Sequence, residues 1–285
     1  MDPLRGMSQS LTVEFTKMHG AGNDFVVLDN RWYRFSDEEL SELGAAWCPR
    51  RYGIGADGLL ALTASDDESV AYRMRYVNAD GSWATMCGNG ARCLARFAAR
   101  AGMGGPTLQF ESDAGRYRAD VPDDDAAPVR LYVPPATRLT SDPELVASVP
   151  EGLEGLHFVH TGTEHLVAFV PDIEAVPVEE WGRMLRQDSA LRPAGANVNF
   201  VAVADGGLQV RTYEKGVEAE TPSCGTGVLA SAIVAVATER VASGRVAVRT
   251  SGGVLHVGTD EVSSGNGQYL EGPVTTTFRG TVEVS

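Results

Sequence analysis

The sequence predicts an α/β protein made of two related halves. The chain has 285 residues, 43% of them hydrophobic, which is more than one typical domain needs to fill its core. One pattern occurs twice: Cys-Gly-polar-Gly opens an apolar helix at Cys87 and again at Cys224. A glycine follows each cysteine by 28 positions (115 − 87 = 252 − 224), Gly115 and Gly252, in a turn between alternating runs typical of strands. We therefore expect one strand-loop-helix-hairpin unit in each half, the two related by a pseudo-two-fold axis.

Start signals and apolar faces predict the other helices in chain order. A capping box at Ser36–Glu39 begins a helix that reaches about Trp47. Ser141–Leu145 has the residues of another helix start, and residues 178–186 are predicted to form a further helix. Residues 225–240 are apolar almost all round, as expected for a helix buried within its own domain. The remainder is predicted to form short strands.

The two halves are expected to meet in a stretch rich in proline and aspartate. Residues 121–135 read VPDDDAAPVRLYVPP and have the weakest helix or strand pattern in the chain. We place the boundary there, which gives an N-terminal half of residues 1–130 and a C-terminal half of residues 131–273.

The composition argues against polyanionic partners and against a membrane location. Asp and Glu (38) exceed Lys and Arg (24), so the formal net charge of −14 repels nucleic acid and anionic membrane surfaces. No stretch of about 18 apolar residues occurs, and residues 1–10 lack the pattern of a signal peptide. We expect a cytoplasmic protein in which the four cysteines are thiols.

No cofactor or metal is expected. Zinc is disfavoured because the chain has no Cys-x-x-Cys pair and its five histidines are scattered. A pyridoxal-dependent enzyme would need a lysine for its Schiff base, and the two lysines, Lys17 and Lys215, lie in no convincing phosphate-binding sequence.

The two Cys-Gly segments predict reactive thiols. A cysteine directly before a helix lies at the positive end of the helix dipole, which favours the thiolate. Glycines let a ligand approach the N-terminal amides, which bind an anion such as a carboxylate. Two such sites face to face would hold one α-carboxylate and place a sulfur on each side of the adjacent carbon. One thiolate would remove the α-proton while the opposite thiol protonates the other face, so the pattern predicts stereoinversion by Cys87 and Cys224.

Less specific interpretations exist for each cysteine. A single Cys before Gly is more often a small buried residue, but two matched sites favour the catalytic interpretation. A disulfide between Cys87 and Cys224 would need an oxidised sample, and a hydrolase using Cys224 with His165 would leave Cys87 unexplained. We assign the other two cysteines, Cys48 and Cys93, to packing.

These segments belong to a series of motifs that resembles diaminopimelate epimerase along essentially the whole chain, from about Val13 to Phe278. The motifs, in order, are KMHGAGNDF from Lys17, RRYGIGADG from Arg50, YVNADGSWATMCGNGARC from Tyr76, TGTEHLV from Thr161, NVNF from Asn197 and YEKGVEAETPSCGTG from Tyr213. Members of this family interconvert LL- and meso-diaminopimelate, without a cofactor, for lysine and cell-wall synthesis. The resemblance therefore implies an isomerase that acts on an amino acid.

Position by position, the resemblance implies roles for particular residues. Cys87 and Cys224 match the catalytic pair, and the two helix starts match the segments that bind the reacting carboxylate end: Gly88, Asn89, Gly225 and Thr226. Other positions match family residues that contact the substrate. The resemblance also implies that His165 and Glu214 are the polar groups nearest the cysteines. The matched substrate contacts are Asn23, Asn78, Asn197, Glu214 and Lys215.

Several positions depart from the family pattern. Lys215 replaces the usual arginine, so the charge is kept while the planar fork is lost. Thr163 and Glu164 replace the usual Asn-Pro, which removes one amide and adds a negative group. Gly58 stands where some members have a glutamine that contacts substrate, and the loop before Cys224 is one residue longer than in the commonest form. These changes affect the choice of substrate rather than the chemistry.

The same resemblance implies two pseudo-symmetric α/β domains, each a curved, mostly antiparallel sheet wrapped around a central helix. The C-terminal strand, residues 274–285, is expected to return to the first domain, and a homodimer is expected from the family alone. Two alternatives stay open: a racemase or epimerase of the same fold that acts on another amino acid, and a silent member that only binds a small acid. A silent member would be expected to lose a cysteine, and this chain keeps both.

Overall fold

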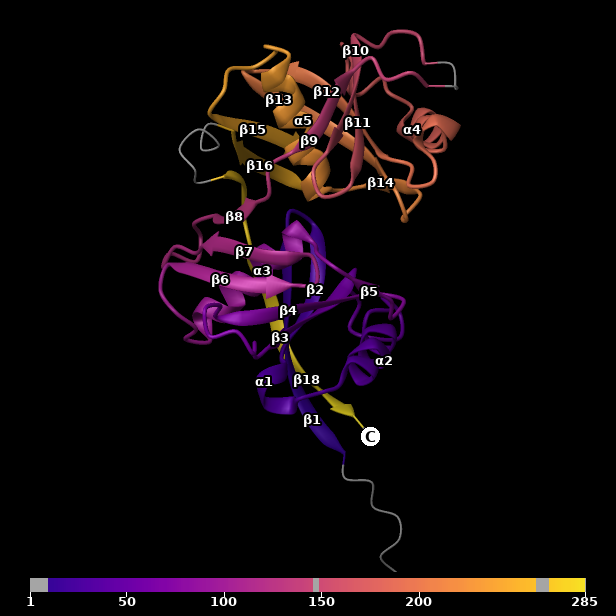
Figure 1. The fold of residues 1–285 in the computed structure, drawn as a ribbon. Helices are drawn as coiled ribbons and strands as arrows, with labels where there is room; N and C mark the ends of the chain where they lie inside the picture. The colour runs from indigo at the N-terminus through magenta and orange to yellow at the C-terminus, as the bar shows by residue number, and fades with distance from the viewer. Residues whose placement is uncertain (1–9, 146–148, 260–266, 285) are drawn as a thin grey trace, which may run out of the picture. The chain divides into compact units, whose positions relative to one another are not determined.

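The computed structural model of the chain describes residues 10–145, 149–259 and 267–284. Its contacts form two compact units, both drawn in Figure 1. The first unit comprises Met1–His19, Asp24–Arg116 and Val274–Ser285, and the second comprises Gly20–Asn23 and Tyr117–Pro273. Helices and strands alternate in both units, so the predicted α/β class is confirmed.

The first unit is a mixed sheet. Strand β18 pairs antiparallel with β1, β1 pairs with β2, and β2 runs parallel to β3. Strand β4 is antiparallel to β3 and β5 and parallel to β6. The bounds are β1 (Leu11–Gly20), β2 (Asn23–Asp29), α1 (Asn30–Tyr33), α2 (Asp37–Trp47), β3 (Gly58–Thr63), β4 (Tyr72–Asn78), β5 (Trp83–Ala84), α3 (Gly88–Arg100), β6 (Thr107–Ser112) and β18 (Thr275–Val284).

The second unit repeats this order. Strand β9 pairs with β10, β10 with β11, β11 runs parallel to β12, and β13 is antiparallel to β12 and β14 and parallel to β15. Strands β16, β17, β8 and β7 then continue the sheet by antiparallel pairing. The bounds are β7 (Gly115–Asp120), β8 (Val129–Val133), β9 (Thr137–Ser141), β10 (Gly155–His160), β11 (Glu164–Phe169), α4 (Val178–Arg186), η1 (Ser189–Leu191), β12 (Asn197–Ala204), β13 (Gly207–Glu214), β14 (Ala219–Thr221), α5 (Gly225–Ala237), β15 (Arg245–Thr250), β16 (Gly253–Gly258) and β17 (Gln268–Gly272).

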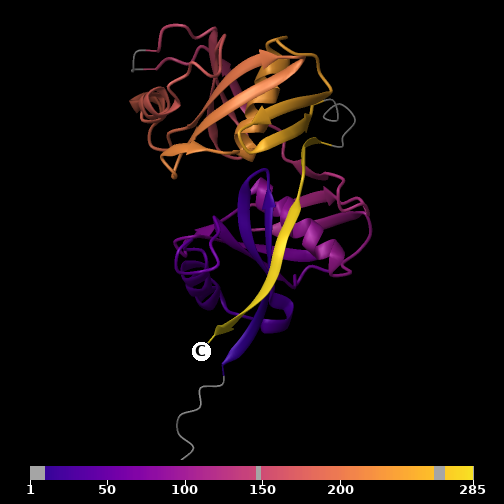
Figure 2. The same ribbon diagram turned by 180° about the vertical axis from the view of Figure 1, so that it is seen from behind.

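The duplication is confirmed by matching strand pairings. Strands β1 to β5 with α2, α3 and β6 correspond to β10 to β14 with α4, α5 and β15, and β18 joins β1 as β9 joins β10. Figure 2 shows β18, in yellow, running beside the indigo strands of the first unit. The strand registers of the two units match residue by residue. Phe25 of β2 pairs with Gly58 of β3, and His165 of β11, at the equivalent position, pairs with Asn197 of β12.

The sequence spacing paired Gly115 with Gly252, and this pairing is wrong by one position. Strand β7 begins at Gly115 and β16 begins at Gly253, and these two glycines share a positive φ, +123° and +130°. Gly252, which the sequence spacing selected, lies in the turn before β16. The second unit therefore has one more residue between its cysteine and its hairpin.

The two central helices are buried within their units. Helix α5 packs its apolar residues against strands on several sides, and Val228, Ala230 and Val234 have no exposed surface. Figure 1 shows α5 among the strands of the second unit, whereas α4 lies at its edge. Helix α5 ends at Ala237, three residues before the predicted end at Arg240, because Glu239 takes a positive φ of 57° that a right-handed helix excludes. Apart from this end, the predicted helix is confirmed.

The outer helices α2 and α4 each cover the face of their own sheet that is opposite the central helix. Both helices were predicted correctly. In α2 the Ser36 hydroxyl accepts from the Glu39 amide and the Glu39 carboxylate accepts from the Ser36 amide, which completes the capping box. Helix α2 packs Leu40 and Leu43 on β1 to β4. Helix α4 packs on β12 and β13 through Val178 and its neighbours.

The helix predicted to start at Ser141 is wrong where it can be compared. Ser141 is the last residue of β9 and pairs with His157, and the Asp142 amide donates to Leu156 O at 2.8 Å. Asp142 has a φ of 49°, which also excludes a right-handed helix start. Residues 142–145 have no helix, and residues 146–148 of the predicted helix lie outside the described residues.

The expected boundary near residue 130 falls within β8. Leu131 of β8 pairs with Leu270 of β17, and Arg118 of β7 pairs with Tyr132. This ladder attaches residues from Tyr117 onward to the second unit.

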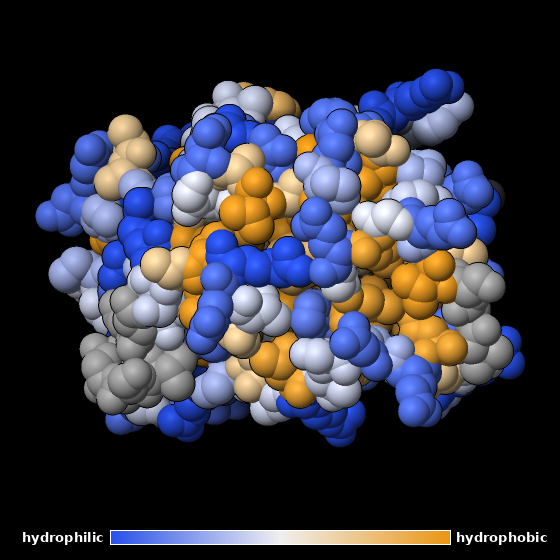
Figure 3. Space-filling view, turned by 90° about the horizontal axis from the view of Figure 1, so that it is seen from above, coloured by the Kyte–Doolittle hydropathy of each residue, from blue (hydrophilic) through white to orange (hydrophobic). Residues whose placement is uncertain are grey.

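The surface carries hydrophobic side chains in several places. On the face shown in Figure 3, hydrophobic residues lie among hydrophilic ones, as on ordinary protein surfaces. Among the described residues, no helix combines the length and the apolar character that crossing a membrane requires.

Each outer helix has a glycine at its contact with the sheet, and replacing this glycine should lower the stability of the protein. A Cβ at Gly182 of α4 would lie 2.4 Å from Tyr213 Cβ, and one at Gly44 of α2 would lie 2.6 Å from Val77 Cγ1. We expect Gly182→Ala to lower the free energy of unfolding by about 1–3 kcal/mol, because the helix must move away from the strand. Met184→Ala, on the exposed side of α4, is the matched control and should change it by less than about 0.5 kcal/mol. Urea unfolding of both variants measures the difference, and equal midpoints would contradict the close packing.

Candidate active site

Cys87 is the N-cap residue of α3. Its backbone is extended (φ −139°, ψ 120°), and its carbonyl accepts from the Ala91 amide at 2.8 Å to begin the helix ladder. The Gly90 amide donates to Cys87 Sγ at 3.5 Å. The partly exposed sulfur therefore lies where the helix amides and dipole favour an anion, as predicted.

Cys224 has the same position at the start of α5. Its backbone is also extended (φ −103°, ψ 108°), and its carbonyl accepts from the Val228 amide at 2.9 Å. The sulfur lies 3.5 Å from Thr226 Oγ1, and the Thr161 hydroxyl donates to Thr226 O at 3.0 Å. Cys224 is 6% exposed, so this thiol is more enclosed than that of Cys87.

The third residue of each helix is a glycine in close contact with a strand side chain. A Cβ at Gly227 would lie 2.2 Å from Asn199 Oδ1, and one at Gly90 would lie 3.1 Å from Leu60 Cδ2. Close approach of the strands therefore requires glycine at Gly227, in addition to any role that the glycines have toward a ligand.

His165 is a fully buried, neutral histidine. Its Nδ1 lies 3.1 Å from Asn199 Nδ2 and its Nε2 lies 3.5 Å from Asn197 Nδ2. Burial, together with the positive charge of Lys215, lowers the pKa of His165 to about 3. Both ring nitrogens lie beside side-chain amide nitrogens. A neutral ring can accept a hydrogen bond from one of them, whereas a doubly protonated ring can accept from neither.

Asn199 orients this histidine and was missed by the sequence analysis. Its Oδ1 accepts from the Thr212 hydroxyl at 3.0 Å, and its Nδ2 donates to Leu166 O at 2.8 Å. Both contacts place the amide nitrogen toward His165. The signal was present in the NVNF motif, because alternation along a strand puts Asn197 and Asn199 on the same side.

Three of the residues that depart from the family pattern lie together in the second unit. Lys215 Nζ donates to Glu164 Oε2 at 2.8 Å, and the Thr163 hydroxyl lies 3.3 Å from the same oxygen. The Lys215 amide donates to Asn197 Oδ1 at 2.7 Å. Burial alone would raise the pKa of Glu164, but the hydrogen bond from Lys215 lowers it, so the carboxylate stays ionised.

Glu214 lies at the end of β13, beside this group. Its Oε2 accepts from the Thr221 hydroxyl at 2.7 Å, which joins β13 to β14. Its carbonyl accepts from the Glu218 amide at 2.8 Å and closes the following loop.

The remaining predicted residues lie on β2, β3, β4 and α3. Asn78 Nδ2 donates to Ser82 Oγ at 3.0 Å, and Gly58 is its partner in the register of β3 and β4. A Cβ at Gly58 would lie 2.6 Å from both Tyr76 Cε2 and Val77 O, so the local sheet excludes a glutamine here. Asn23 is the first residue of β2 and is grouped with the second unit. Asn89 is the second residue of α3 and is 2% exposed.

An ion-pair cluster in the first unit was also missed. Asp24 accepts from Lys17 Nζ at 2.5 Å and from Arg50 at 2.7 and 3.0 Å. Burial alone would raise the pKa of Asp24, but the hydrogen bonds from Arg50 and Lys17 hold it well below its ordinary value. Asp24 precedes Phe25 as Glu164 precedes His165, so each of the two lysines of the chain pairs with a carboxylate at equivalent positions.

The central helix of the first unit contains a second missed feature, the buried Arg92. It has no exposed surface, and it donates to Asn89 Oδ1 at 2.7 Å and to Gly88 O at 3.3 Å. Arg92 shares one helix stripe with Arg96 and Arg100, a spacing typical of an exposed polar face, so no sequence signal marked its burial.

Cys48 and Cys93 are buried, and their assignment to packing is confirmed. Burial raises the pKa of each thiol to about 12, so both remain protonated near neutral pH. Among the described residues, no three His, Cys, Asp or Glu side chains are grouped as metal ligands.

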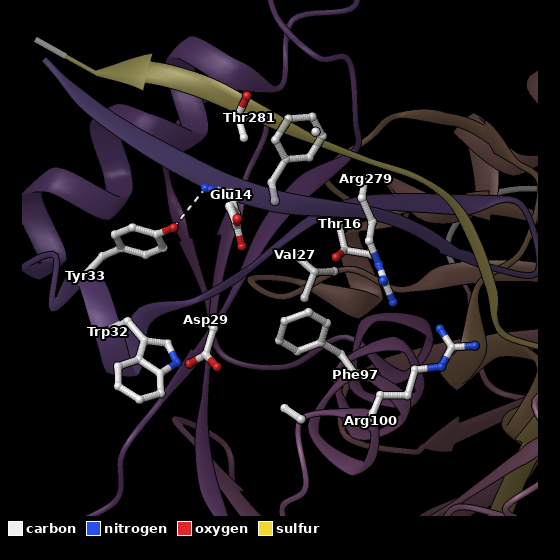
Figure 4. Close-up of a pocket in the computed structure, with 13 residues that line it drawn as sticks. Glu14, Thr16, Val27, Asp29, Trp32, Tyr33, Phe97, Arg100, Arg279 and Thr281 are labelled. Atoms are coloured by element: carbon white, nitrogen blue, oxygen red, sulfur yellow. Dashed lines mark hydrogen bonds between the residues drawn. The ribbon is translucent and has the colours of Figure 1, made fainter.

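A pocket of about 630 Å³ lies in the first unit, away from the predicted site residues. Figure 4 shows Glu14 and Thr16 of β1, Asp29 of β2, Trp32 of α1 and Arg100 of α3 around it. No predicted site residue lines it. Arg100 is the last residue of α3, so this pocket belongs to the opposite end of the helix from Cys87.

The chain is similar to known proteins along most of its length. The family model described as diaminopimelate epimerase matches residues 15–139 and 157–277. A diaminopimelate epimerase from Chlorobaculum tepidum is 40% identical over 93% of this chain and 99% of its own length, and one from Methanothrix thermoacetophila is 40% identical over 95% and 96%. Each match includes nearly the whole of both chains.

Solved structures show the same fold at low identity. A protein of the PhzF phenazine biosynthesis family from Bacillus anthracis has a TM-score of 0.75 with 14% identity, and the match covers 96% of this chain and 100% of that one. A hydroxyproline epimerase from Agrobacterium vitis has a TM-score of 0.65 with 16% identity, covering 96% and 93%. The sequence relatives show more than the fold: the chain belongs to the diaminopimelate epimerase family.

Proposed function

We propose that the protein is a cofactor-independent isomerase that interconverts LL- and meso-diaminopimelate. The observation that carries the proposal is the pair of matched helix starts, each with a cysteine at its N-cap, in a member of this family. Helix amides from Gly88-Asn89 and Gly225-Thr226 bind the α-carboxylate, and one thiol comes from each unit.

In the proposed reaction the two cysteines exchange one proton each with the substrate. The thiolate of one cysteine takes the α-proton and becomes a thiol, and the electron pair of the C–H bond passes into the enolate-like carboxylate. The thiol of the other cysteine then protonates the opposite face and becomes a thiolate. Helix-end amides stabilise the developing charge, so this step uses only the chain's own groups.

His165 supports the second unit in the proposed site without transferring protons. Its pKa, lowered to about 3 by burial, makes the ring too weak a base to take up a proton near neutral pH. It holds Asn197 and Asn199 in place, and Asn197 in turn binds the Lys215 amide. Glu214, Asn23 and Asn78 complete the proposed substrate contacts.

The far end of the substrate meets Lys215 and Glu164 in this proposal. The C6 end of diaminopimelate has one ammonium and one carboxylate, and the pair offers one opposite charge to each. Thr163 supports the Glu164 carboxylate. This pair replaces the contact that an arginine usually makes in the family. The replacement also favours the alternative function, an epimerase of the same fold that acts on another amino acid.

We further propose a cytoplasmic homodimer, as expected for the family. The first unit exposes apolar side chains suited to burial against a second copy, among them Trp32 (79% exposed) and Phe278 (46% exposed).

The reaction is tested by proton NMR of the reduced protein with LL-diaminopimelate in D2O. We expect loss of the α-proton signal and appearance of the meso form, whereas Cys87→Ala and Cys224→Ala each reduce inversion by at least about 1,000-fold, because one of the two proton-transfer groups is gone. Cys48→Ala is the matched control, since that thiol is buried and protonated. A wild-type protein that leaves diaminopimelate unchanged but racemises another amino acid would support the alternative substrate.

The distal contact is tested with two substrates. We expect Lys215→Met to lower kcat/KM for diaminopimelate about 10- to 100-fold, because a hydrogen bond to a charged group contributes about 1.5–3 kcal/mol. Glu164→Gln should lower kcat/KM for diaminopimelate but not for 2-aminopimelate, which has the distal carboxylate and lacks the distal ammonium. Lys215→Arg should keep most activity on both. Equal losses for both substrates in Glu164→Gln would contradict the role of Glu164.

The neutral state of His165 predicts a pH-dependent stability. Its pKa is about 3 when folded and 6.5 when unfolded, so the unfolded chain binds more protons between these values and stability rises with pH across that window. We expect His165→Gln to be less stable than wild type at pH 7, with a gap that narrows by up to about 1.4 kcal/mol per pH unit below pH 6.5. Urea midpoints from pH 5 to 8.5 measure this. The gap should be constant above pH 7.5, and a gap that stays constant down to pH 5 would show that His165 is protonated in the folded protein.

A further inference from the structure

Arg92 is a fully buried charge for which the proposed function gives no role. It lies five residues after Cys87, one turn and a half into α3, and has no exposed surface. The equivalent residue of the second unit, five after Cys224, is Leu229, which is buried among apolar side chains. The five residues that follow each cysteine therefore differ by one positive charge between the two halves.

The position is unfavourable for a cation unless an anion is near. The N-terminal end of a helix carries positive partial charge, and a buried charge needs a partner. Within the described residues Arg92 pairs with no carboxylate: its contacts are Gly88 O and Asn89 Oδ1, and its Nε has no partner. Arginine nevertheless remains protonated in proteins.

The titratable groups around Arg92 leave Cys87 as its anionic partner. Cys93, on the same helix, is held as a thiol with a pKa of about 12. By strand alternation β3 presents Leu60 and Leu62 to α3, and β4 presents Tyr72 and Tyr76. Burial raises the pKa of Tyr72 well above its ordinary value, so it too is neutral.

Charged groups of the other strands face the far end of α3. Glu14 of β1, Asp29 of β2 and Arg279 of β18 line the pocket beside Arg100. Arg100 is eight residues beyond Arg92, or about 12 Å along the helix at about 1.5 Å per residue. Arg96, one turn beyond Arg92, is 2% exposed and adds a second guanidinium to this helix rather than a neutralising charge.

We propose that Arg92 is a positioning residue that stabilises the thiolate of Cys87 and orients Asn89, so that the resting protein carries its negative sulfur in the first unit. The guanidinium supplies the opposite charge for the anion at this helix start. Its bond to Asn89 Oδ1 fixes the orientation of the Asn89 side-chain amide. The second unit, with Leu229, has no such charge, so Cys224 is the thiol that donates first. The inference rests on the proposed acid–base role of Cys87, while its test uses no substrate.

The experiment measures the alkylation rate of Cys87 by the neutral reagent iodoacetamide as a function of pH. Cys224→Ala is the background, so that Cys87 is the accessible thiol, and Arg92→Leu copies the residue of the second unit. We expect Arg92→Leu to raise the pH midpoint of alkylation by about one unit or more, which is about a tenfold loss of rate below the midpoint. Arg92→Lys, which keeps the charge, should restore most of the shift. Circular dichroism checks folding, since apolar replacement of a buried charge is often tolerated.

The matched control is Cys224 in a Cys87→Ala background, whose midpoint should not move when Arg92→Leu is added. A folded Arg92→Leu protein with an unchanged Cys87 midpoint overturns the proposal, and so does an equal shift in Arg92→Leu and Arg92→Lys. A protein that shows the expected shift but does not act on diaminopimelate would support Arg92 and remove the proposed substrate.

Discussion

Each unit depends on the burial of one helix against its own sheet. Helix α5 has apolar residues on nearly every side, and α3 is buried along most of its length. A helix held in this way has its first amides fixed by the core rather than by a mobile loop. A cysteine at the N-cap therefore receives both a fixed position and a favourable field, and this holds at Cys87 and at Cys224.

The repeated scaffold carries different side chains at equivalent positions. His165 corresponds to Phe25 and Asn197 to Gly58 in the strand register, and Leu229 corresponds to Arg92 along the central helices. In the proposed reaction the two faces of the α-carbon need similar thiols, whereas the far end of the substrate needs one pocket only. The polar group around His165 and Lys215 lies in the second unit, and the first unit has the apolar Phe25 at the position equivalent to the histidine.

Burial decides the charge of most groups near the cysteines. It keeps His165 neutral and keeps Cys48 and Cys93 as thiols, while ion pairing keeps Asp24 and Glu164 as carboxylates. Lys215 pairs with Glu164, and the buried guanidinium of Arg92 binds Asn89. Because each is held by defined partners, substitutions at these positions have distinct expected effects on substrate choice and on thiol reactivity.

The sequence by itself determined the duplication, the capping box at Ser36 and the two cysteines at helix starts, because each depends on residues close together in the chain. Only the tertiary structure decided that Ser141 ends a strand, since its pairing partner His157 lies 16 residues away. It also decided that Lys215 pairs with Glu164, that Asn199 holds His165 and that Arg92 is buried. These features depend on which distant strands pack together, and a local pattern contains no information about such neighbours.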